Sequence, residues 1–459
     1  MAQLDQSNNV EKLTPGDGDL WFLPLGGTGE IGMNMNLLGH AGDWIMVDCG
    51  VTFDETLSPD THKTFSVVAA DPKFISRQRE SLKAIIITHA HEDHLGALPF
   101  LWPRLKAPVY ASPFAAEVLR RKLSQHGLES KVPINVIALR ERFTVGAFTL
   151  EFLPITHSIP EAQSLLIETS VGKLLHTADW KIDHDPVVGE PFDEGLYQGL
   201  AKENILALLC DSTNALKPGA SLSESICYRG ILRQVDAVEG RIVVSCFSSN
   251  LARLITVARV AEAIGRRFAL LGRSLRNMYA IAKQTGYWPE ELVPIDEQHL
   301  GYLPANEVFA IATGSQGEER AALNRLSLDT YPALSLERGD RIVMSSFLIP
   351  GNERLVERML DRFKARNISV IESAQSDTPI HASGHPCQAE LADMYTWVQP
   401  LVAVPLHGEA EHLAANAGVA KRFGVPVQLI GENGDLYELA PRQRIHYAKV
   451  TTGRIPLVE

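Results

Sequence analysis

Several features are scarce or missing in this chain. Its five cysteines lie far apart and form no CxxC pair, which argues against both a disulfide framework and a zinc ribbon. No apolar run approaches the ~20 residues that a transmembrane helix needs, and the polar, acidic N-terminus is no secretory signal peptide. We therefore expect a cytoplasmic protein with buried, reduced thiols and no association with a membrane.

Positive charge is also in short supply. The 43 Lys and Arg are outnumbered by 55 Asp and Glu, which gives a formal net charge of −12. This balance argues against a nonspecific polyanion binder, whose domain is usually basic. A nucleic-acid enzyme stays open, because a local basic groove and bound metal ions can reverse the sign of the charge where the substrate binds.

Length and pattern indicate more than one domain. The 459 residues suggest about two to three domains. In the first half, short apolar or alternating runs punctuated by Gly, Pro and Asp predict strands. A helix over 112–127 interrupts them, with Ser112 as its N-cap and Gly127 as its stop.

The pattern changes after about Lys217. From there strands and helices alternate, which predicts a parallel sheet covered by helices. We therefore expect an α/β chain divided into residues 1–217, an inserted lobe at 218–375 and a tail at 376–459. In the tail, an Asn-Gly turn predicts a hairpin at 431–439.

One glycine pattern resembles a cofactor motif. The stretch GGTGEIG has the GxGxxG spacing at Gly27, Gly29 and Gly32. A dinucleotide fingerprint requires a helix next, but residues 34–48, NMNLLGHAGDWIMVD, predict two strands joined by a glycine turn. We interpret the glycines as a turn that approaches the active site.

The segment THAHEDH, residues 88–94, follows an apolar strand. On an extended segment, His89 and His91 face the same way, so both imidazoles can reach one ion. The chain then turns into a helix, where Asp93 and His94 can point at a second ion. Imidazole and carboxylate are the ligands that Zn²⁺ or Mn²⁺ takes.

Further donors end later strands, at His157, Asp179 and His407. Each is weak evidence alone, but together they complete two sites. One ion would take His89, His91 and His157, the other Asp93, His94 and His407, and Asp179 would span them. Asp48 would hold a ligand imidazole in the correct tautomer.

This order of motifs resembles the metallo-β-lactamase superfamily, which implies an αββα sandwich and two divalent ions. Zn²⁺ is the first choice, with Mn²⁺ or Mg²⁺ as alternatives. The superfamily includes lactamases, lactonases, thiolesterases, flavodiiron oxidoreductases and nucleases, so the fold alone leaves the function open.

The inserted lobe resembles the β-CASP domain of nucleases. Asp211 in LLCDSTNA, His385 in HASGHP and His407 in VPLHGE stand at that family's motifs A, B and C. RNA-directed members carry His at motif C, where DNA-directed members carry a small apolar residue, so the resemblance implies RNA. Nearly the whole chain, from PLGGTGEIGMN to VPLHGEAEH, is similar to the bacterial ribonuclease J family.

This resemblance implies a 5′-to-3′ exonuclease that acts on single-stranded RNA, prefers a 5′-monophosphate and has some endonuclease activity. Asp93 would orient the nucleophile, and His385 near Asp211 would stabilise the phosphorane or protonate the leaving oxygen. A purely endonucleolytic β-CASP ribonuclease and a small-molecule hydrolase of the superfamily are the alternatives.

A 5′-phosphate pocket would use hydroxyls and backbone N–H groups. The candidates are Ser383, Gly384, His385, Ser248, Ser249, Asn250 and Ser315, each of which can instead be a turn former or a cap. Phe53 would stack on a base or belong to the core. Arg253, Arg273 and Arg276 would line an RNA channel or simply be solvated.

Two departures from the family stand out. The family usually has a further C-terminal domain of about a hundred residues that helps dimerisation. This chain stops at Glu459, which puts the expected homodimer in doubt. Met33 replaces a Lys of the family pattern, which would remove one positive charge near the cleft.

Overall fold

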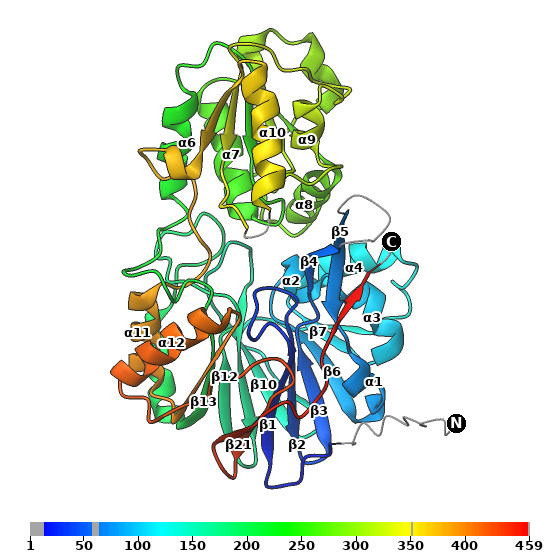
Figure 1. Cartoon of the computed structure of the whole chain (residues 1–459), viewed down its shortest axis with the longest axis vertical. Coiled ribbons are helices and arrows are strands. Elements are labelled where there is room, and N and C mark those ends of the chain that lie inside the picture. Colours follow the sequence, from blue (N-terminus) through cyan, green and yellow to red (C-terminus); the bar gives the residue numbers. More distant parts are fainter. Residues whose placement is uncertain (1–12, 57–63, 350–351, 458–459) are drawn as a thin grey trace, which may run out of the picture.

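The computed structural model describes residues 13–56, 64–349 and 352–457. They form two lobes stacked along the long axis of the molecule (Figure 1). The N-terminal residues 1–12, on which the prediction of no secretory signal rests, lie outside the described residues. Residues 350–351 lie outside them too. Within the described residues, no helix is both long and apolar enough to cross a membrane.

The lower lobe contains an eight-stranded mixed sheet. Its order is β22 (Arg444–His446), β21 (Leu436–Ala440), β1 (Leu20–Gly26), β2 (Met35–His40), β3 (Asp43–Val47), β6 (Leu82–Ile87), β7 (Val109–Ala111) and β8 (Ile134–Val136). The pairs from β22 to β3 are antiparallel, and those from β3 to β8 are parallel.

A seven-stranded sheet faces it. Its order is β20 (Val427–Gln428), β19 (Val402–Leu406), β13 (Ile205–Asp211), β12 (Gly172–His176), β11 (Gln163–Thr169), β10 (Phe148–Pro154) and β9 (Arg142–Val145). The strands from β12 to β20 are parallel neighbours. Their carboxyl ends therefore meet at one edge, which is where ligands bind in such sheets.

The core of the lower lobe lies between these two sheets. Phe22 and Ile86 of the first sheet pack in one buried cluster with Phe152, Leu165 and Leu209 of the second. The outer face of the first sheet is covered by α1 (Lys73–Ser76), α3 (Leu98–Leu105) and α4 (Pro113–Gln125), and that of the second by α5 (Glu194–Gly199), α11 (Gln388–Val398) and α12 (Ala410–Arg422). The expected αββα sandwich is confirmed.

A small three-stranded sheet rises from the lower lobe towards the upper one (Figure 1). It consists of β4 (Val51–Thr56), β5 (Thr64–Ala70) and β23 (Arg454–Pro456). The last strand pairs with β5 over Val68–Ala70. Residues from two distant parts of the sequence thus share this sheet.

The upper lobe is built on a parallel five-stranded sheet. Its order is β15 (Arg267–Leu271), β16 (Val308–Ala312), β14 (Ile242–Ser245), β17 (Arg341–Met344) and β18 (Ser369–Glu372). The helices of this lobe are α6 (Ile226–Val235), α7 (Leu251–Ala263), α8 (Arg273–Gln284), α9 (Ala322–Ser327) and α10 (Glu353–Ala365). The parallel sheet covered by helices is confirmed.

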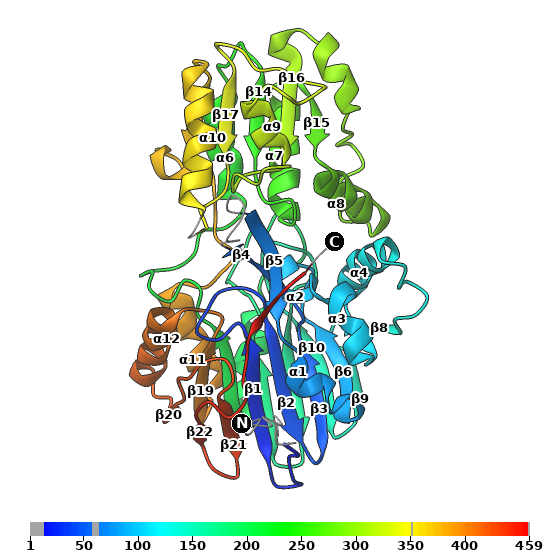
Figure 2. The same ribbon diagram turned by 45° about the vertical axis from the view of Figure 1, so that its right-hand side comes forward.

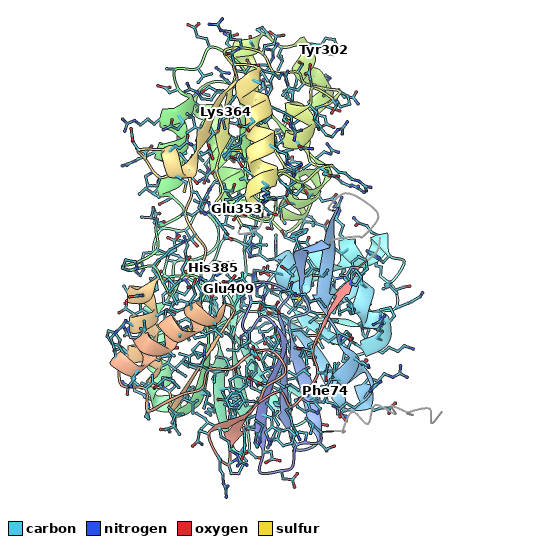
Figure 3. The ribbon with its side chains drawn as sticks, in the orientation of Figure 1. Phe74, Tyr302, Glu353, Lys364, His385 and Glu409 are labelled. Atoms are coloured by element: carbon cyan, nitrogen blue, oxygen red, sulfur yellow. The ribbon has the colours of Figure 1, made fainter. Side chains whose placement is uncertain are left out.

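The carboxyl ends of these strands face the lower lobe. Helix α10 follows β17, and Figure 3 shows Glu353, its first residue, at the lower end of the upper lobe and Lys364 higher up. The loops after β14, β16 and β17 therefore border the space above the lower lobe. These loops carry several of the predicted RNA-binding residues.

The two segments that join the lobes are held by buried polar groups. Glu390, 2% exposed, accepts hydrogen bonds from the backbone N–H groups of Ile182, Ser221 and Cys387. The buried ammonium of Lys181 donates to the Leu222 carbonyl at 2.9 Å. This network fixes the connection firmly to the lower lobe.

Local patterns predicted most elements, with one correction. The helix at 112–127 is α4, with Ser112 as its N-cap, but the predicted hairpin at 431–439 is wrong. Strand β20 belongs to the second sheet and β21 to the first, so the turn carries the chain between sheets. The Asn433 side chain accepts from the Thr28 N–H at 3.0 Å, which uses the turn for a tertiary contact.

Met33 packs in the core of the lower lobe. Its side chain is 2% exposed. The loss of a positive charge near the cleft, relative to the family pattern, stays a prediction.

Candidate active site

The predicted metal ligands come from the ends of four strands in the two large sheets. The HxHxDH segment follows β6, and α2 (Glu92–Leu95) begins inside it with His91 as N-cap. His157, Asp179 and His407 follow β10, β12 and β19. The structure brings all seven predicted donors together in two clusters that share Asp179.

Three imidazoles form the first cluster. The Nε2 atoms of His89 and His157 each lie 3.1 Å from Nδ1 of His91. Oδ2 of Asp179 is 3.9 Å from Nε2 of His89 and 3.8 Å from Nε2 of His157. The four donor atoms thus converge on one point.

The second cluster lies on the other side of Asp179. Nε2 of His94 is 3.2 Å from Asp179 Oδ2 and 3.5 Å from Asp93 Oδ2. Nε2 of His407 is also 3.5 Å from Asp93 Oδ2. Asp179 therefore contacts both clusters, as a bridging carboxylate would.

The protonation of the first cluster suits a metal ion. Burial lowers the pKa of His91 to about 4 and holds the pKa of His89 and of His157 well below the usual value. Neutral imidazoles offer a lone pair to an ion. A tetrahedral ion bound at about 2.0–2.1 Å separates its nitrogen ligands by about 3.3 Å, close to the distances here. The donor set fits a divalent metal ion.

The second cluster is organised by carboxylates. Burial disfavours the charged form of His407, but the hydrogen bond from its Nδ1 to Asp179 Oδ1 at 2.7 Å prevails and raises its pKa to about 10. His94 Nδ1 donates to Asp48 Oδ2 at 2.7 Å, and Asp48 is itself held by the Thr88 N–H and hydroxyl. Asp48 thus orients His94 so that its Nε2 faces the cluster.

His157 is oriented by a segment that returns from the upper lobe. Its Nδ1 donates to the Gly384 carbonyl at 2.6 Å. A Cβ atom at Gly384 would lie 2.5 Å from the His157 ring, so only glycine fits there. The Ser383–His385 segment is therefore in direct contact with the first cluster.

His385 and Asp211 form a pair beside both clusters. His385 Nδ1 lies 2.8 Å from Asp211 Oδ2. Burial opposes a charge on His385, but the carboxylates of Asp211 and Asp179 raise its pKa overall. The Asn214 amide donates to Ser383 Oγ at 2.7 Å and to the His385 carbonyl at 3.1 Å, which fixes this loop.

The other predicted phosphate ligands lie in the upper lobe. Ser248 and Ser249 are half-buried just before α7. Asn250 caps that helix, because its Oδ1 accepts from the Arg253 N–H at 2.8 Å. Ser315, 3% exposed, is buried in the loop after β16. Asn250 is therefore a helix cap, which is the alternative that the sequence left open for it. Ser248 and Ser249 lie directly before it, at the start of α7.

The three predicted channel arginines differ. Arg273 and Arg276 are exposed on α8, and Arg276 pairs with Glu297 at 2.9 Å. The side chain of Arg253 is fully buried and pairs with Glu224 at 2.5 Å. The expectation that Arg253 lines an RNA channel is wrong, because its charge is neutralised inside the protein.

Phe53 lies on the surface and not in the core, since it is 55% exposed on β4.

The sequence also missed a residue of the centre, Asn34. Its Nδ2 donates to the Asp93 carbonyl at 3.2 Å and lies 3.2 Å from His94 Nε2 and 3.4 Å from His407 Nε2. The signal was present, because Asn34 directly follows the glycine turn that was expected to approach the site.

Three domain families match separate parts of the chain. Residues 29–204 match the metallo-beta-lactamase superfamily, and residues 239–363 match "Ribonuclease J, beta-CASP domain". Residues 377–429 match the "Zn-dependent metallo-hydrolase RNA specificity domain". This last match covers the segment with His385 and His407.

Curated relatives match over most of the chain. Ribonuclease J of Sinorhizobium meliloti is 43% identical over 93% of this chain and 75% of its own length. Ribonuclease J of Mycolicibacterium smegmatis is 36% identical over 95% and 78%, and ribonuclease J 1 of Streptococcus pyogenes is 36% identical over 90% and 73%.

A solved structure has the same fold. It is a protein of unknown function from Enterococcus faecalis, 16% identical, which covers 92% of this chain and 100% of its own with a TM-score of 0.62. The domain matches and the extended identity to its relatives agree with the geometry of the centre: the chain belongs to the ribonuclease J family of metal-dependent ribonucleases.

Proposed function

We propose that this ribonuclease removes nucleotides from the 5′ end of single-stranded RNA and prefers a 5′-monophosphate. The observation that carries the proposal is the Ser383–His385 segment. Its Gly384 carbonyl accepts a hydrogen bond from His157 of the first cluster at 2.6 Å. Its His385 Nδ1 lies 2.8 Å from Asp211 Oδ2. A phosphate bound at this segment would lie close to the reacting centre.

The proposed cofactor is a pair of Zn²⁺ ions. His89, His91 and His157 would hold one ion, Asp93, His94 and His407 the other, and Asp179 both, as the two donor clusters indicate. When bound, two such ions lower the pKa of a water molecule and neutralise charge on the scissile phosphate. Imidazole-rich donor sets favour Zn²⁺ over Mg²⁺, which takes oxygen ligands.

The protein side chains supply proton transfer and orientation. Asp93 is the most exposed carboxylate of the centre, with a side chain 32% exposed, and it orients the attacking water. His385, held by Asp211, donates a proton to the leaving 3′ oxygen. In-line attack leaves a 5′-phosphate on the remaining RNA, which again has the preferred end.

The proposed 5′-phosphate pocket joins both lobes. Ser383 and Gly384 contribute from the returning segment, and Ser248 and Ser249 contribute from the start of α7, where the helix dipole favours an anion. Arg273 and Arg276 would lead the RNA backbone towards this pocket.

The test uses RNA labelled at its 3′ end that carries a 5′-monophosphate, triphosphate or hydroxyl. Release of mononucleotides, fastest from the monophosphate form, is expected. The Ser383→Ala variant should lose most of the preference between ends, whereas Ser335→Ala, an exposed serine of the upper lobe, should keep it. Discrete internal fragments that do not depend on the 5′ end would favour an endonuclease instead.

A further inference from the structure

Phe347 is an exposed aromatic residue of the upper lobe. It lies in the loop between β17 and α10 and is 43% exposed. That loop belongs to the edge of the upper sheet that faces the lower lobe, as the position of Glu353 in Figure 3 shows. Single exposed apolar side chains are common on protein surfaces, so the neighbours of this ring carry the argument.

Two other rings support Phe347. Its ring centroid is 5.7 Å from that of Phe247 in the loop after β14, with the planes tilted by 56°. It is 5.6 Å from the ring of His381 on the returning segment. Three segments thus contribute to one aromatic surface, in the tilted arrangement that aromatic pairs favour.

The backbone around Phe347 is anchored. The buried side chain of Gln316 donates to the Phe347 carbonyl at 2.9 Å and accepts from the Ile349 N–H at 2.9 Å. Both contacts tie the loop after β17 to the loop after β16. The backbone at Phe347 and Ile349 is therefore held in place, which reduces the entropy lost when a ligand stacks on the ring.

The returning segment connects this surface to the chemistry. His381, which contacts Phe347, precedes His385 by four residues along the chain. The carbonyl of Ile380, just before it, accepts from the buried Arg253 guanidinium at 3.2 Å. Arg253 also donates to the Ala382 carbonyl at 3.5 Å. The segment is thus held on both sides of His381, the residue that links the Phe347 ring to the chain leading to His385.

We propose that Phe347, backed by Phe247 and His381, is a stacking site for a nucleobase of single-stranded RNA. The proposal rests on the ribonuclease function of the chain. Aromatic rings stack on every base, and this contact does not depend on backbone charge. In a protein with a net charge of −12, stacking would supply affinity that salt does not screen.

The test measures binding of 5′-monophosphorylated oligonucleotides with non-hydrolysable linkages to the metal-loaded full chain. One set has normal bases and the other has abasic sites near the 5′ end. Phe347→Ala should weaken binding of the normal RNA about five- to tenfold. The loss should be the same at low and high salt, Phe347→Trp should retain affinity, and the abasic RNA should bind wild type and variant equally.

Tyr302→Ala is the matched control. Tyr302 is 88% exposed at the far end of the upper lobe (Figure 3), and its loss should leave both oligonucleotides unaffected. Phe347→Leu keeps an apolar side chain without a ring, and it should behave as Phe347→Ala does.

Three results would overturn the proposal. The first is an equal loss of affinity for normal and abasic RNA in Phe347→Ala, and the second is full affinity in Phe347→Leu. The third is a change in the light-scattering mass of Phe347→Ala with unchanged base dependence, which would make Phe347 a contact between copies of the chain. Binding is measured without cleavage, so failure of the exonuclease proposal would appear separately, as absent mononucleotide release from wild type.

Discussion

Two buried polar clusters of this protein are built in opposite ways. In the metal centre, Nε2 of His89 and Nε2 of His157 each lie 3.1 Å from Nδ1 of His91. Burial lowers the pKa of all three imidazoles. Around Arg253 in the upper lobe, Nε, Nη1 and Nη2 all find acceptors. The metal centre needs an ion to be complete, whereas the hydrogen bonds of Arg253 are complete within the protein.

The difference shows how a buried charge can serve function or architecture. A converging set of lone pairs binds a cation, and the free energy of that binding adds to the stability of the fold. A paired guanidinium instead joins segments of the chain. Arg253 contacts Glu224 just before α6, Ser345 just after β17, and Ile380 in the segment that returns to the lower lobe. Removing a group should therefore have different consequences in the two places.

The largest effect is expected at Asp179. Asp179→Asn should lower kcat by at least about a thousandfold, because a carboxylate that belongs to both donor clusters, and is proposed to bridge the ions, is lost. Metal content by atomic spectroscopy should fall in parallel, with a circular dichroism spectrum like that of wild type. Full activity with both ions retained would refute the bridging role.

Arg253→Met should act on stability first. It leaves Glu224 buried without a partner, and breaking a buried pair in this way costs about 3–5 kcal/mol. Urea unfolding measures the loss. The double variant Arg253→Met/Glu224→Leu should recover much of it, and a double variant as unstable as the single one would contradict the paired-charge account.

Asp211→Asn should lower kcat by about a hundredfold, the contribution typical of a proton-transfer residue. The change weakens the support of His385, whose Nδ1 lies 2.8 Å from Asp211. Both metal ions should remain bound, which separates this variant from Asp179→Asn. A loss of metal together with activity would instead assign Asp211 to the metal centre.

The smallest effect is expected where the lobes touch away from their connection, between α4 and α8 (Figures 1 and 2). Tyr287 donates to Glu161 Oε1 at 2.9 Å, and its ring meets Phe114 at 5.6 Å. Tyr287→Phe should cost about 1 kcal/mol in thermal or urea unfolding. A large loss of activity at unchanged stability would mean that this contact controls access to the cleft.

Part of the site was accessible to sequence reasoning because its donors end predictable strands. His89, His157 and His407 each follow an apolar run, and the parallel strands bring such ends to one edge. Asn34 was missed although it lies just after the glycine turn, because no local pattern shows which side chain near a turn reaches the centre. Its amide reaches the centre through a turn whose geometry depends on Gly27 and Gly32, both at positive φ.

Arg253 shows the opposite failure. An arginine near the start of a helix in an RNA enzyme suggests a phosphate ligand. The partner of Arg253 is instead Glu224, which lies 29 residues away in the sequence. The hairpin error has a similar cause. The Asn-Gly pair predicts a reversal of the chain. The sheet to which each flanking strand belongs depends on its pairing with strands far away in the sequence.

The sequence by itself determined the chemical inventory of this protein. It determined the donors of the two His/Asp clusters, the alternating pattern of the inserted lobe, and the mix of strands that pack as a sandwich, because apolar periodicity and ligand spacing are local properties. Tertiary structure alone decided that Arg253 is buried and Phe347 exposed, and that Gly384 rests against His157. Burial and orientation depend on segments far apart in the chain, and no local pattern records which of them will meet.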